Sequence, residues 1–586
     1  MDDTEHFTSD PDGVNVAWKG VQELWEKQLL CDVKLVAQGQ VFQVHRVYLA
    51  SCSGYFHSLF TQGYKESTKG EVSIHGVTAA ALDAIIRYLY TGSIDINQNN
   101  IIDILHAGSM LQIDDVQTFC CRYLKSHVES DNCIEYLQAA EFYSLVETAR
   151  HIWEYMLKNF GSFSSTDIFL KCDSDMLCQL LASDSLEVDS EMTLFDSIVR
   201  WLADDSGRLL CARKLLKLIR YGLMSLKEIR QIKSHKIFVQ ADCGDEIQKL
   251  LQEATDYHHN IYEQPLVDSP LVQPRAYWNS LVVIQENRDR DEDLVVGASR
   301  VIMKELSEFC RVGQKSPFQN TSLFSACASA TLNNCVFVAG GMIDTTGVDT
   351  AFRYNGSTGE WLQLANMNGS HCDFALVALS DCLFAVGGAG GFDTEAEKYS
   401  LRENSWARLP SVDWSVYANA GCACGGLVYI SGGVYGDTDP DVNDASARVQ
   451  CFDPDLNSWT QKSPMNIGRM SHAMVAVREK IFVCGGESGM LEGGPNILTS
   501  EVYDFKTDQW STVAPMPFSS FHSGAACYND SVYIVGGEGE MEDLPHGILM
   551  RFDMDLNEWS VQRTQLKNIM WGVAGFLKIS TQTYKK

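Results

Sequence analysis

Histidine is the side chain in this sequence best suited to catalysis or metal binding, because imidazole transfers protons and ligates metals near neutral pH. Four histidines lie at similar points of a repeated pattern or in one of its loops: His371, His472, His522 and His546. The repetition of the pattern explains them better than a shared metal does. The pair His258–His259 has no cysteine or carboxylate at helical ligand spacing. We therefore expect neither a metal site nor a cofactor.

A glycine-rich stretch, GGAGGF at residues 387–392, invites comparison with a phosphate-binding loop. It lacks the Lys-Ser/Thr of such a loop and does not open a helix, so nucleotide binding is not expected. The 19 cysteines are scattered and form no CxxC, which favours buried apolar roles over redox or zinc chemistry. The sequence therefore predicts a protein that is not an enzyme.

The glycine-rich stretch belongs to a unit that recurs five times in the second half of the chain. Each copy has an apolar run that ends in a glycine pair, then a loop, then an aromatic residue seven positions before a tryptophan. The aromatic pairs are Tyr354/Trp361, Tyr399/Trp406, Phe452/Trp459, Tyr503/Trp510 and Phe552/Trp559. β-branched and aromatic residues suit buried strands, and a period of about 45 to 55 residues is typical of four-stranded propeller blades. We expect the glycines and tryptophans to be architectural.

This order of glycine pair, aromatic residue and tryptophan resembles the Kelch repeat, and it predicts an all-β, six-bladed Kelch propeller over residues 276–580. The first blade departs from the pattern, because Gln285 and Glu286 stand where the glycine pair should be. We expect the final apolar run, Gly572–Ile579, to close this blade and remove the open sheet edges.

Length and charge limit the remaining possibilities. With 586 residues the chain is too long for one core, and we expect three domains. A net charge of −30 repels DNA, RNA and acidic membranes, and it favours a basic or apolar partner segment. The N-terminus lacks the basic start and apolar core of a secretory signal, and no window approaches a membrane span. We expect a cytoplasmic protein, without excluding the nucleus, that does not insert into membranes.

Residues 1–128 combine short strands with amphipathic helices, which predicts an α/β domain. The run CDVKLVAQGQVFQVHRVYLASCSGYFHSLF, followed later by YLYTG, resembles the BTB domain. Such domains are usually homodimers, and the resemblance places Asp32, His45 and Arg46 near the dimer seam. A buried ion pair that holds the fold is the alternative for these charged side chains.

The segment Tyr64-Lys65-Glu66, just after Phe60, fits the "hydrophobic-x-Glu" pattern that cullin-binding members of the BTB family use. An exposed aromatic ring beside a carboxylate can combine apolar anchoring with pairing to a basic partner. The resemblance therefore implies that Phe60, Tyr64 and Glu66 contact a cullin. A solvated loop is the alternative.

Residues 129–261 show helical periodicity and predict an all-α domain, with Asp131-Asn132 and Thr193 as expected helix starts. The segments DNCIEYLQAAEFY, MTLFDSIVRWL and EATDYHH resemble the BACK domain. The linker at residues 262–275 carries three prolines, which are expected to keep it stiff and extended.

The order BTB, BACK, Kelch resembles the Kelch-like substrate adaptors of cullin-3 ubiquitin ligases. The resemblance implies that the BTB domain and the first BACK helices hold cullin-3 while the propeller holds a protein substrate for ubiquitination. A dimeric cytoskeletal, actin-associated scaffold is the alternative. The two share fold and dimer but differ in cullin binding.

In the Kelch family the substrate face is formed by loops after the glycine pairs and by residues about fifteen positions before them. The positions before the pairs are Ser325, Cys372, Tyr417, Met470 and Phe521, with Trp571 in the closing strand. The positions after the pairs are Asp344, Phe392, Tyr435, Glu487 and Glu538. Aromatic rings beside carboxylates favour a basic and apolar substrate segment. Packing between blades is the alternative for the aromatic residues.

Overall fold

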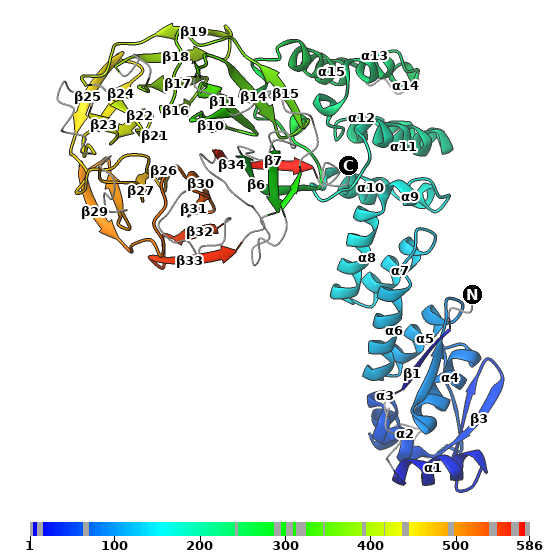
Figure 1. Ribbon diagram of the computed structural model, residues 1–586. Coiled ribbons are helices and arrows are strands. Elements are labelled where there is room, and N and C mark those ends of the chain that lie inside the picture. The colour runs from blue at the N-terminus through cyan, green and yellow to red at the C-terminus, as the bar shows by residue number, and fades with distance from the viewer. Residues whose placement is uncertain are drawn as a thin grey trace. The chain divides into compact units, whose positions relative to one another are not determined.

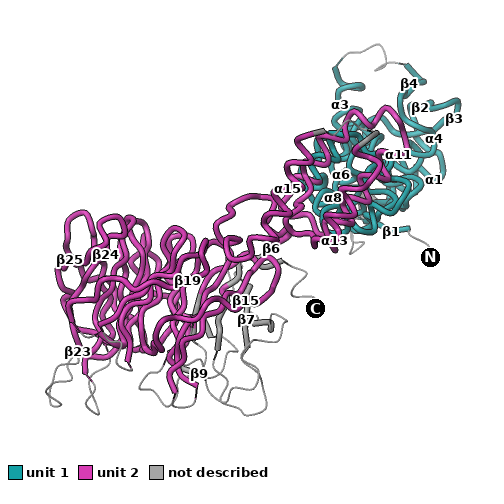
Figure 2. Tube along the Cα trace, turned by 90° about the horizontal axis from the view of Figure 1, so that it is seen from above, with its two compact units in different colours: residues 1–180 teal, residues 181–586 magenta. Residues whose placement is uncertain are grey.

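The computed structural model of the chain describes residues 4–8, 16–62, 69–240, 244–285, 295–300, 309–311, 324–343, 346–389, 394–414, 416–435, 445–489, 497–537, 548–563 and 573–580. The chain divides into two compact units, Met1–Leu180 and Leu181–Lys586 (Figure 2). The division falls inside the helical segment predicted over residues 129–261. The later helices of that segment therefore belong to the same unit as the C-terminal sheets.

A small sheet and surrounding helices form the N-terminal part of the first unit, as predicted for an α/β domain. Strand β2 (Val33–Ala37) pairs antiparallel with β3 (Gln40–Val44) and parallel with β4 (Glu71–Ser73). Alternate residues of β2 are buried, which is why the strand reads as an alternating pattern in the sequence. The helices are α1 (Val16–Glu26), α2 (Arg46–Cys52), α3 (Gly54–Thr61), α4 (Ala79–Thr91), α5 (Ile101–Met110) and α6 (Asp114–Ser126).

The first described residues form a strand that the sequence analysis missed. Strand β1 (Glu5–Thr8) pairs antiparallel with β5 (Ser93–Ile96), and Phe7 is buried against the ring of Phe119. Only Phe7 in this acidic, polar stretch carries an apolar signal. A single apolar residue is too little to predict a strand, because the pairing depends on a partner far away in the sequence.

Helices continue through the rest of the first unit and into the second. They are α7 (Cys133–Phe142), α8 (Val146–Lys158), α9 (Phe160–Phe163), α10 (Ser174–Ala182), α11 (Glu191–Asp204), α12 (Ala212–Leu216), α13 (Leu226–Lys233), α14 (Ile237–Gln240) and α15 (Gly244–His259). Short 3-10 helices lie between some of them, at Phe169–Lys171, Ser206–Cys211 and Tyr221–Leu223. The expected all-α segment is confirmed in its class.

The helix starts differ in part from those expected. Asn132 does precede α7, but its side chain accepts from the Glu129 amide at 2.8 Å and not from the helix. Thr193 lies inside α11, whose N-cap is Ser190, because the Ser190 hydroxyl accepts from the Thr193 amide at 3.1 Å. The N-cap thus lies three residues before the expected one.

Six four-stranded antiparallel sheets make up the C-terminal part of the second unit, which confirms the predicted propeller. From inside to outside, the first three blades are β34 (Val573–Ser580), β6 (Tyr277–Gln285), β7 (Val295–Arg300), β8 (Phe309–Arg311); β10 (Ala328–Leu332), β11 (Cys335–Ala339), β14 (Ala351–Asn355), β15 (Glu360–Gln363); and β16 (Ala375–Leu379), β17 (Cys382–Val386), β18 (Ala396–Ser400), β19 (Ser405–Arg408).

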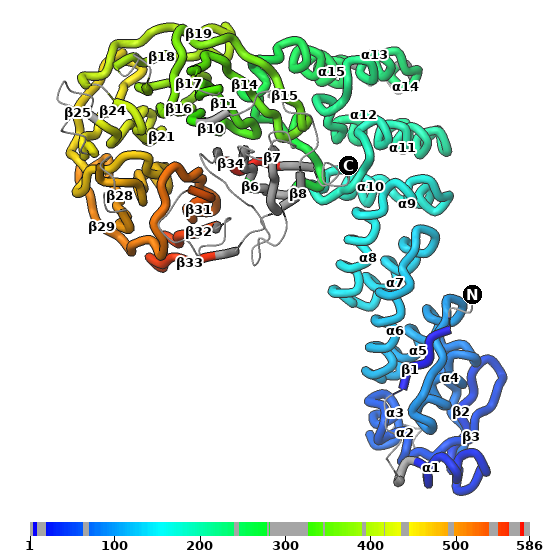
Figure 3. The backbone as a smooth tube through the Cα atoms, in the orientation of Figure 1, coloured from blue at the N-terminus to red at the C-terminus, as the bar shows by residue number. Residues whose placement is uncertain are grey.

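The other three blades are β21 (Ala420–Cys424), β22 (Leu427–Ser431), β24 (Val449–Asp453), β25 (Ser458–Lys462); β26 (Ala473–Val477), β27 (Lys480–Cys484), β28 (Ser500–Asp504), β29 (Gln509–Val513); and β30 (Gly524–Tyr528), β31 (Ser531–Val535), β32 (Ile548–Asp553), β33 (Glu558–Arg563). Figure 1 shows the innermost strands around the centre of the ring. In Figure 3 the C-terminal strand β34 lies beside β6, and the two pair along their length.

The glycine pairs bring neighbouring blades together. Gly432 and Gly433 both have positive φ, +65° and +89°, a conformation that side chains rarely adopt. A Cβ atom on Gly432 would lie 2.2 Å from the Arg469 carbonyl oxygen of the next blade. The Gly433 amide donates to that same carbonyl at 2.8 Å. Glycine is therefore required at this junction.

The tryptophans also lie between blades, as the sequence suggested. In each repeat the aromatic residue and the tryptophan are direct cross-strand partners, as Tyr399 and Trp406 are in blade three. The Trp406 indole donates to the Ala365 carbonyl of blade two at 2.9 Å, and Trp459, Trp510 and Trp559 make the corresponding bond. The architectural interpretation holds for these residues.

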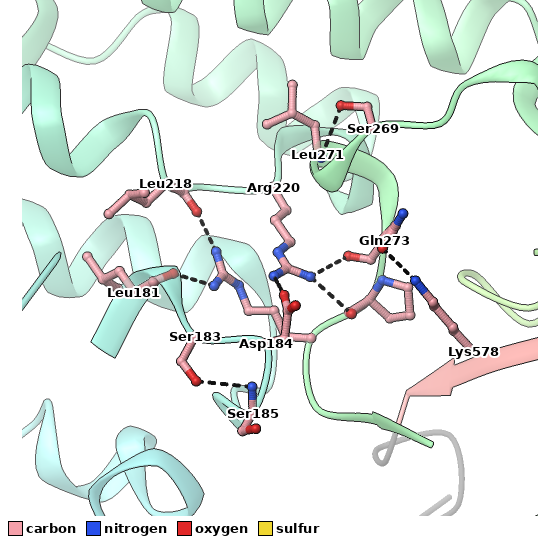
Figure 4. A network of polar contacts seen from close by, with 12 residues as sticks. Leu181, Ser183, Asp184, Ser185, Leu218, Arg220, Ser269, Leu271, Gln273 and Lys578 are labelled. Carbon is pink, nitrogen blue, oxygen red and sulfur yellow. Dashed lines mark hydrogen bonds and ion pairs between the residues drawn. The ribbon is translucent and has the colours of Figure 1, made fainter. Parts of the chain in front are cut away.

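The segment that joins helices to propeller is not simply extended, because it contains 3-10 turns at Gln264–Leu266 and Pro270–Val272. Two arginines fix its end. Arg220 donates to the carbonyls of Gln273 and Pro274 and pairs with Asp184 (Figure 4). Arg275 forms a buried ion pair with Glu191 at 2.6 Å. The linker is thus held by the second-unit helices.

Candidate functional site

A belt of backbone hydrogen bonds surrounds one mouth of the propeller channel. Its members are the residues just before the innermost strands of five consecutive blades: Ala326, Asp373, Ala418, Ser471 and His522. All five have positive φ, between +51° and +56°. From Asp373 onward, each amide donates to the carbonyl of the previous member, at 2.8 to 3.0 Å. The left-handed conformation recurs at positions that take part in the same kind of backbone hydrogen bond.

The two sets of residues predicted for the substrate face can be located relative to the belt. Each position predicted before a glycine pair directly precedes a belt residue, and its partner follows the glycine pair of the same blade. Met470 and Glu487 exchange two backbone hydrogen bonds of 3.0 Å. Tyr417 pairs with Val434, and Tyr435 with Val416, in the ribbon of β20 (Val416–Tyr417) and β23 (Val434–Tyr435). Met470 and Glu487 are therefore direct partners, whereas the partner of Tyr417 lies one position before Tyr435.

Fewer of the predicted side chains are exposed for contact with a partner than the prediction named. Tyr417, Glu487 and Phe521 are partly exposed. Met470 is only 4% exposed and packs with Ala418 and Val434, so it is a core residue and not a contact surface. The side chain of Tyr435 lies outside the described part of the chain. So do four whole residues of the prediction, Asp344, Phe392, Glu538 and Trp571.

Inside the belt lies a cavity of about 470 Å³, lined by the innermost strands and by all five belt residues. The sequence analysis missed its acidic group, Asp373. Burial raises the pKa of the Asp373 carboxyl to about 6. Counting one position beyond Cys372 would have found it, but nothing in the sequence shows that this position faces the channel.

The histidines of the propeller have separate structural roles. His371 is buried and contacts the Gly387 carbonyl and Glu397. His472 bonds the Ser431 hydroxyl at 2.8 Å, and His522 the Ser471 hydroxyl at 2.8 Å. Burial lowers the pKa of His522 to about 4. His371 lies two residues before its belt residue, His472 lies one residue after, and His522 is itself a belt residue, so their positions are similar but not equivalent. Across the described residues no cluster of three or more metal-ligating side chains is found.

The cysteines of the propeller are the other side chains that could take part in chemistry. All cysteines of the described segments are free, and most are buried. Burial raises the pKa of Cys335 to about 11 and that of Cys484 to about 12. A thiol with so high a pKa is protonated at neutral pH and is a poor nucleophile. These cysteines behave as small core residues.

In the first unit the three residues predicted for a dimer seam contact their own chain. The Asp32 carboxylate accepts from the Arg46 amide at 2.8 Å and lies 3.8 Å from the Arg46 guanidinium. The hydroxyl of Tyr90 accepts from the His45 amide and lies 2.9 Å from His45 Nδ1. Beside them, Leu30 and Val47 are 80% and 83% exposed. Asp32, His45 and Arg46 thus help to hold the fold next to an exposed apolar surface.

The domain composition of the chain decides its family. Residues 21–128 match the BTB/POZ domain, residues 133–234 match the BACK domain ("BTB And C-terminal Kelch"), and residues 323–368, 417–466 and 468–517 match the Kelch motif. The chain belongs to the BTB–BACK–Kelch family. Its resemblance to that family, inferred above from short segments, is confirmed.

The chain is similar to Kelch-like proteins over most of its own length and of theirs. The chain is 29% identical to Kelch-like protein 26 of Danio rerio over 94% of this chain and 91% of that protein. It is 29% identical to Kelch-like protein 36 of Bos taurus, with coverages of 93% and 89%. For Kelch-like protein 15 of Homo sapiens the identity is 26%, with coverages of 95% and 94%.

Only one of the three cullin-contact residues predicted for this BTB–BACK–Kelch protein is described. Phe60 stacks on Phe56, with ring centroids 5.9 Å apart, and the Arg46 guanidinium lies over the Phe60 ring, 5.3 Å from its centroid. Tyr64 and Glu66 lie outside the described residues. Phe142 and Val146 are also 77% and 72% exposed, where α7 meets α8. Their exposure could not be predicted from the sequence, because both residues fit the apolar pattern of a core.

None of the helices in the described part of the chain is long and apolar enough to cross a membrane.

Proposed function

We propose that this BTB–BACK–Kelch protein is the substrate-recognition adaptor of a cullin-3–RING ubiquitin ligase. The first unit and its exposed α7–α8 corner bind cullin-3, and the propeller binds a protein substrate at the mouth of its channel. The observation that supports this most is the presence of BTB, BACK and Kelch domains in one chain that is similar to Kelch-like proteins over most of its length. The adaptor performs no catalysis and acts in the cytoplasm.

The chemistry supplied by such an adaptor is proximity. Holding a substrate beside a ubiquitin-charged enzyme turns a bimolecular encounter into an intramolecular one and raises the effective concentration of the acceptor lysine. This role requires two binding surfaces and no nucleophile, which agrees with the buried histidines and protonated thiols of the propeller. A cytoskeletal scaffold would use the same propeller but would not bind cullin-3.

Titration of the full chain with purified cullin-3 tests the proposal. Tyr64→Ala with Glu66→Ala is expected to weaken binding about tenfold or more, because a few anchors carry most interface energy. Leu456→Ala, at an exposed leucine of a propeller turn, is the control and should bind like the parent. If the parent chain does not bind cullin-3, the scaffold is favoured. Equal affinity of the double variant and the parent would remove this surface from the proposal.

We also expect a homodimer through the BTB domain. The exposed Leu30 and Val47 are large apolar side chains that a partner copy would cover. Light scattering of the full chain should give twice the mass of one chain, and Leu30→Asp with Val47→Asp should give the mass of one. The control Leu210→Asp, at a leucine 91% exposed in the second unit, should remain dimeric. A monomeric parent chain would contradict the prediction.

A further inference from the structure

One carboxylate stands out among the residues that line the propeller channel. The cavity wall consists of small, apolar, hydroxyl, thiol, amide and imidazole side chains contributed by six blades. Within the described residues of this lining, Asp373 is the only one that carries a formal charge when its histidines are neutral. Burial keeps the pKa of His472 near 3 and that of His522 near 4. Among the described lining residues, no cation therefore balances Asp373.

The surroundings of Asp373 leave its carboxylate without a partner. In the described part of the chain, neither carboxylate oxygen forms a hydrogen bond or ion pair, although its amide donates to Ala326 and its carbonyl accepts from Ala418. Both belt neighbours are alanines, so no side chain from either adjacent position reaches toward the carboxylate. Ser471 and His522, farther along the belt, bond each other at 2.8 Å. The carboxylate is thus built into the mouth of the cavity but is not used by the fold.

We infer that Asp373 receives one lysine or arginine side chain of a bound protein segment, which enters the mouth of the channel. This inference rests on the proposed function, in which the propeller binds the substrate. A cation is the ligand that relieves a partly buried carboxylate, and the long stem of lysine or arginine can pass between the small side chains of the wall. The cavity, about 470 Å³, is large enough for such a side chain.

The rim favours a peptide over a small free amine. Tyr417 and Phe521, which directly precede two belt residues, are partly exposed at the same mouth. Burial raises the pKa of the Tyr417 phenol, and the nearby Asp373 carboxylate raises it further. A peptide segment could place an apolar residue on these rings and a basic residue over Asp373, and so contact both the rings and the carboxylate. Asp373 therefore selects for the position of a basic residue in the segment.

Selection of displayed random peptides by the purified full chain tests this inference. The parent chain is expected to enrich peptides with one Lys or Arg at a fixed distance from an apolar residue. Asp373→Asn is expected to lose that preference and to bind a synthetic copy of a selected peptide at least about tenfold more weakly. Asn retains the left-handed backbone well, so the variant should fold. Asp381→Asn, in the turn at the far end of β16 and paired with Arg402, is the matched control and should select as the parent does.

A peptide with norleucine in place of its Lys or Arg completes a double-mutant cycle. It should bind the parent chain as weakly as the basic peptide binds Asp373→Asn, with no further loss when both changes are combined. Enrichment of no peptide, of peptides without a fixed basic residue, or unchanged affinity of Asp373→Asn would overturn the inference. Binding of spermidine to the parent as tightly as the peptide would also overturn it. Cullin-3 is absent from this experiment, so failure of the adaptor proposal would show separately, in the cullin titration.

Discussion

Replacing Glu501 with glutamine is expected to lower the free energy of unfolding of the propeller by about 3 to 5 kcal/mol, because it leaves a buried arginine charge without its counter-charge. Arg469 and Glu501 are 2.8 Å apart, and their side chains are 0% and 1% exposed. Arg469 also donates to the Gly485 and Thr499 carbonyls. Glu501 accepts two further bonds from Asn466, both of 2.8 Å. These contacts join the segment that precedes β26, the innermost strand of blade five, to β28, its third strand.

Glu479→Gln on the same blade is the matched control. The Glu479 carboxylate lies 2.6 Å from Lys506, but both side chains are well exposed, so loss of this pair should change stability little. Urea unfolding of the full chain measures the change in stability. Hydrogen exchange of the β28 amides then assigns the lost stability to this blade. Arg469→Met with Glu501→Met should cost less than the two single changes added together. Equal shifts for Glu501→Gln and Glu479→Gln would contradict the argument.

The fold could be predicted from the sequence where local patterns repeat. The glycine pairs and the aromatic residues seven positions before each tryptophan recur because each blade makes the same contacts with the next one, as Gly433 does with Arg469 and Trp406 with Ala365. Elements without a repeated or periodic signal were missed. Strand β1 depends on distant β5. Helix α13 was also missed, although Ser225 and Glu228 form a capping box that could have indicated its start.

The candidate site was predictable in register but not in side-chain exposure. Counting back from the glycine pairs found the residues that precede the belt, and the bonds between Met470 and Glu487 agree with that count. Counting could not show that Met470 is buried while the next position faces the channel. Orientation depends on the left-handed belt conformation, which Ala326, Asp373, Ala418, Ser471 and His522 share without sharing a residue type. A conformation adopted by such different side chains leaves no signature in one sequence.

Asp373→Asn is expected to make the protein more stable at neutral pH while it weakens partner binding. The pKa of Asp373 is raised from 3.8 to about 6 by burial, so the folded state holds this proton more tightly than the unfolded state. Between about pH 4 and pH 6 the folded state therefore binds more protons, and the free energy of unfolding falls as pH rises through that window. At about 1.4 kcal/mol for each pKa unit, the carboxylate costs the parent chain about 2 to 3 kcal/mol above pH 6.

Urea unfolding of the two chains at pH 7.5 and at pH 4 would measure this cost. Asp373→Asn should exceed the parent by about 2 to 3 kcal/mol at the higher pH, and the difference should shrink toward zero at the lower one. Asp381→Asn should show the opposite sign, because Arg402 lowers the pKa of Asp381 and stabilises its charged form. If Asp373→Asn is no more stable than the parent at pH 7.5, the carboxylate already has a partner. If it is, the fold retains a destabilising charge at the mouth of its channel, and a basic side chain that paired with Asp373 would recover that energy on binding.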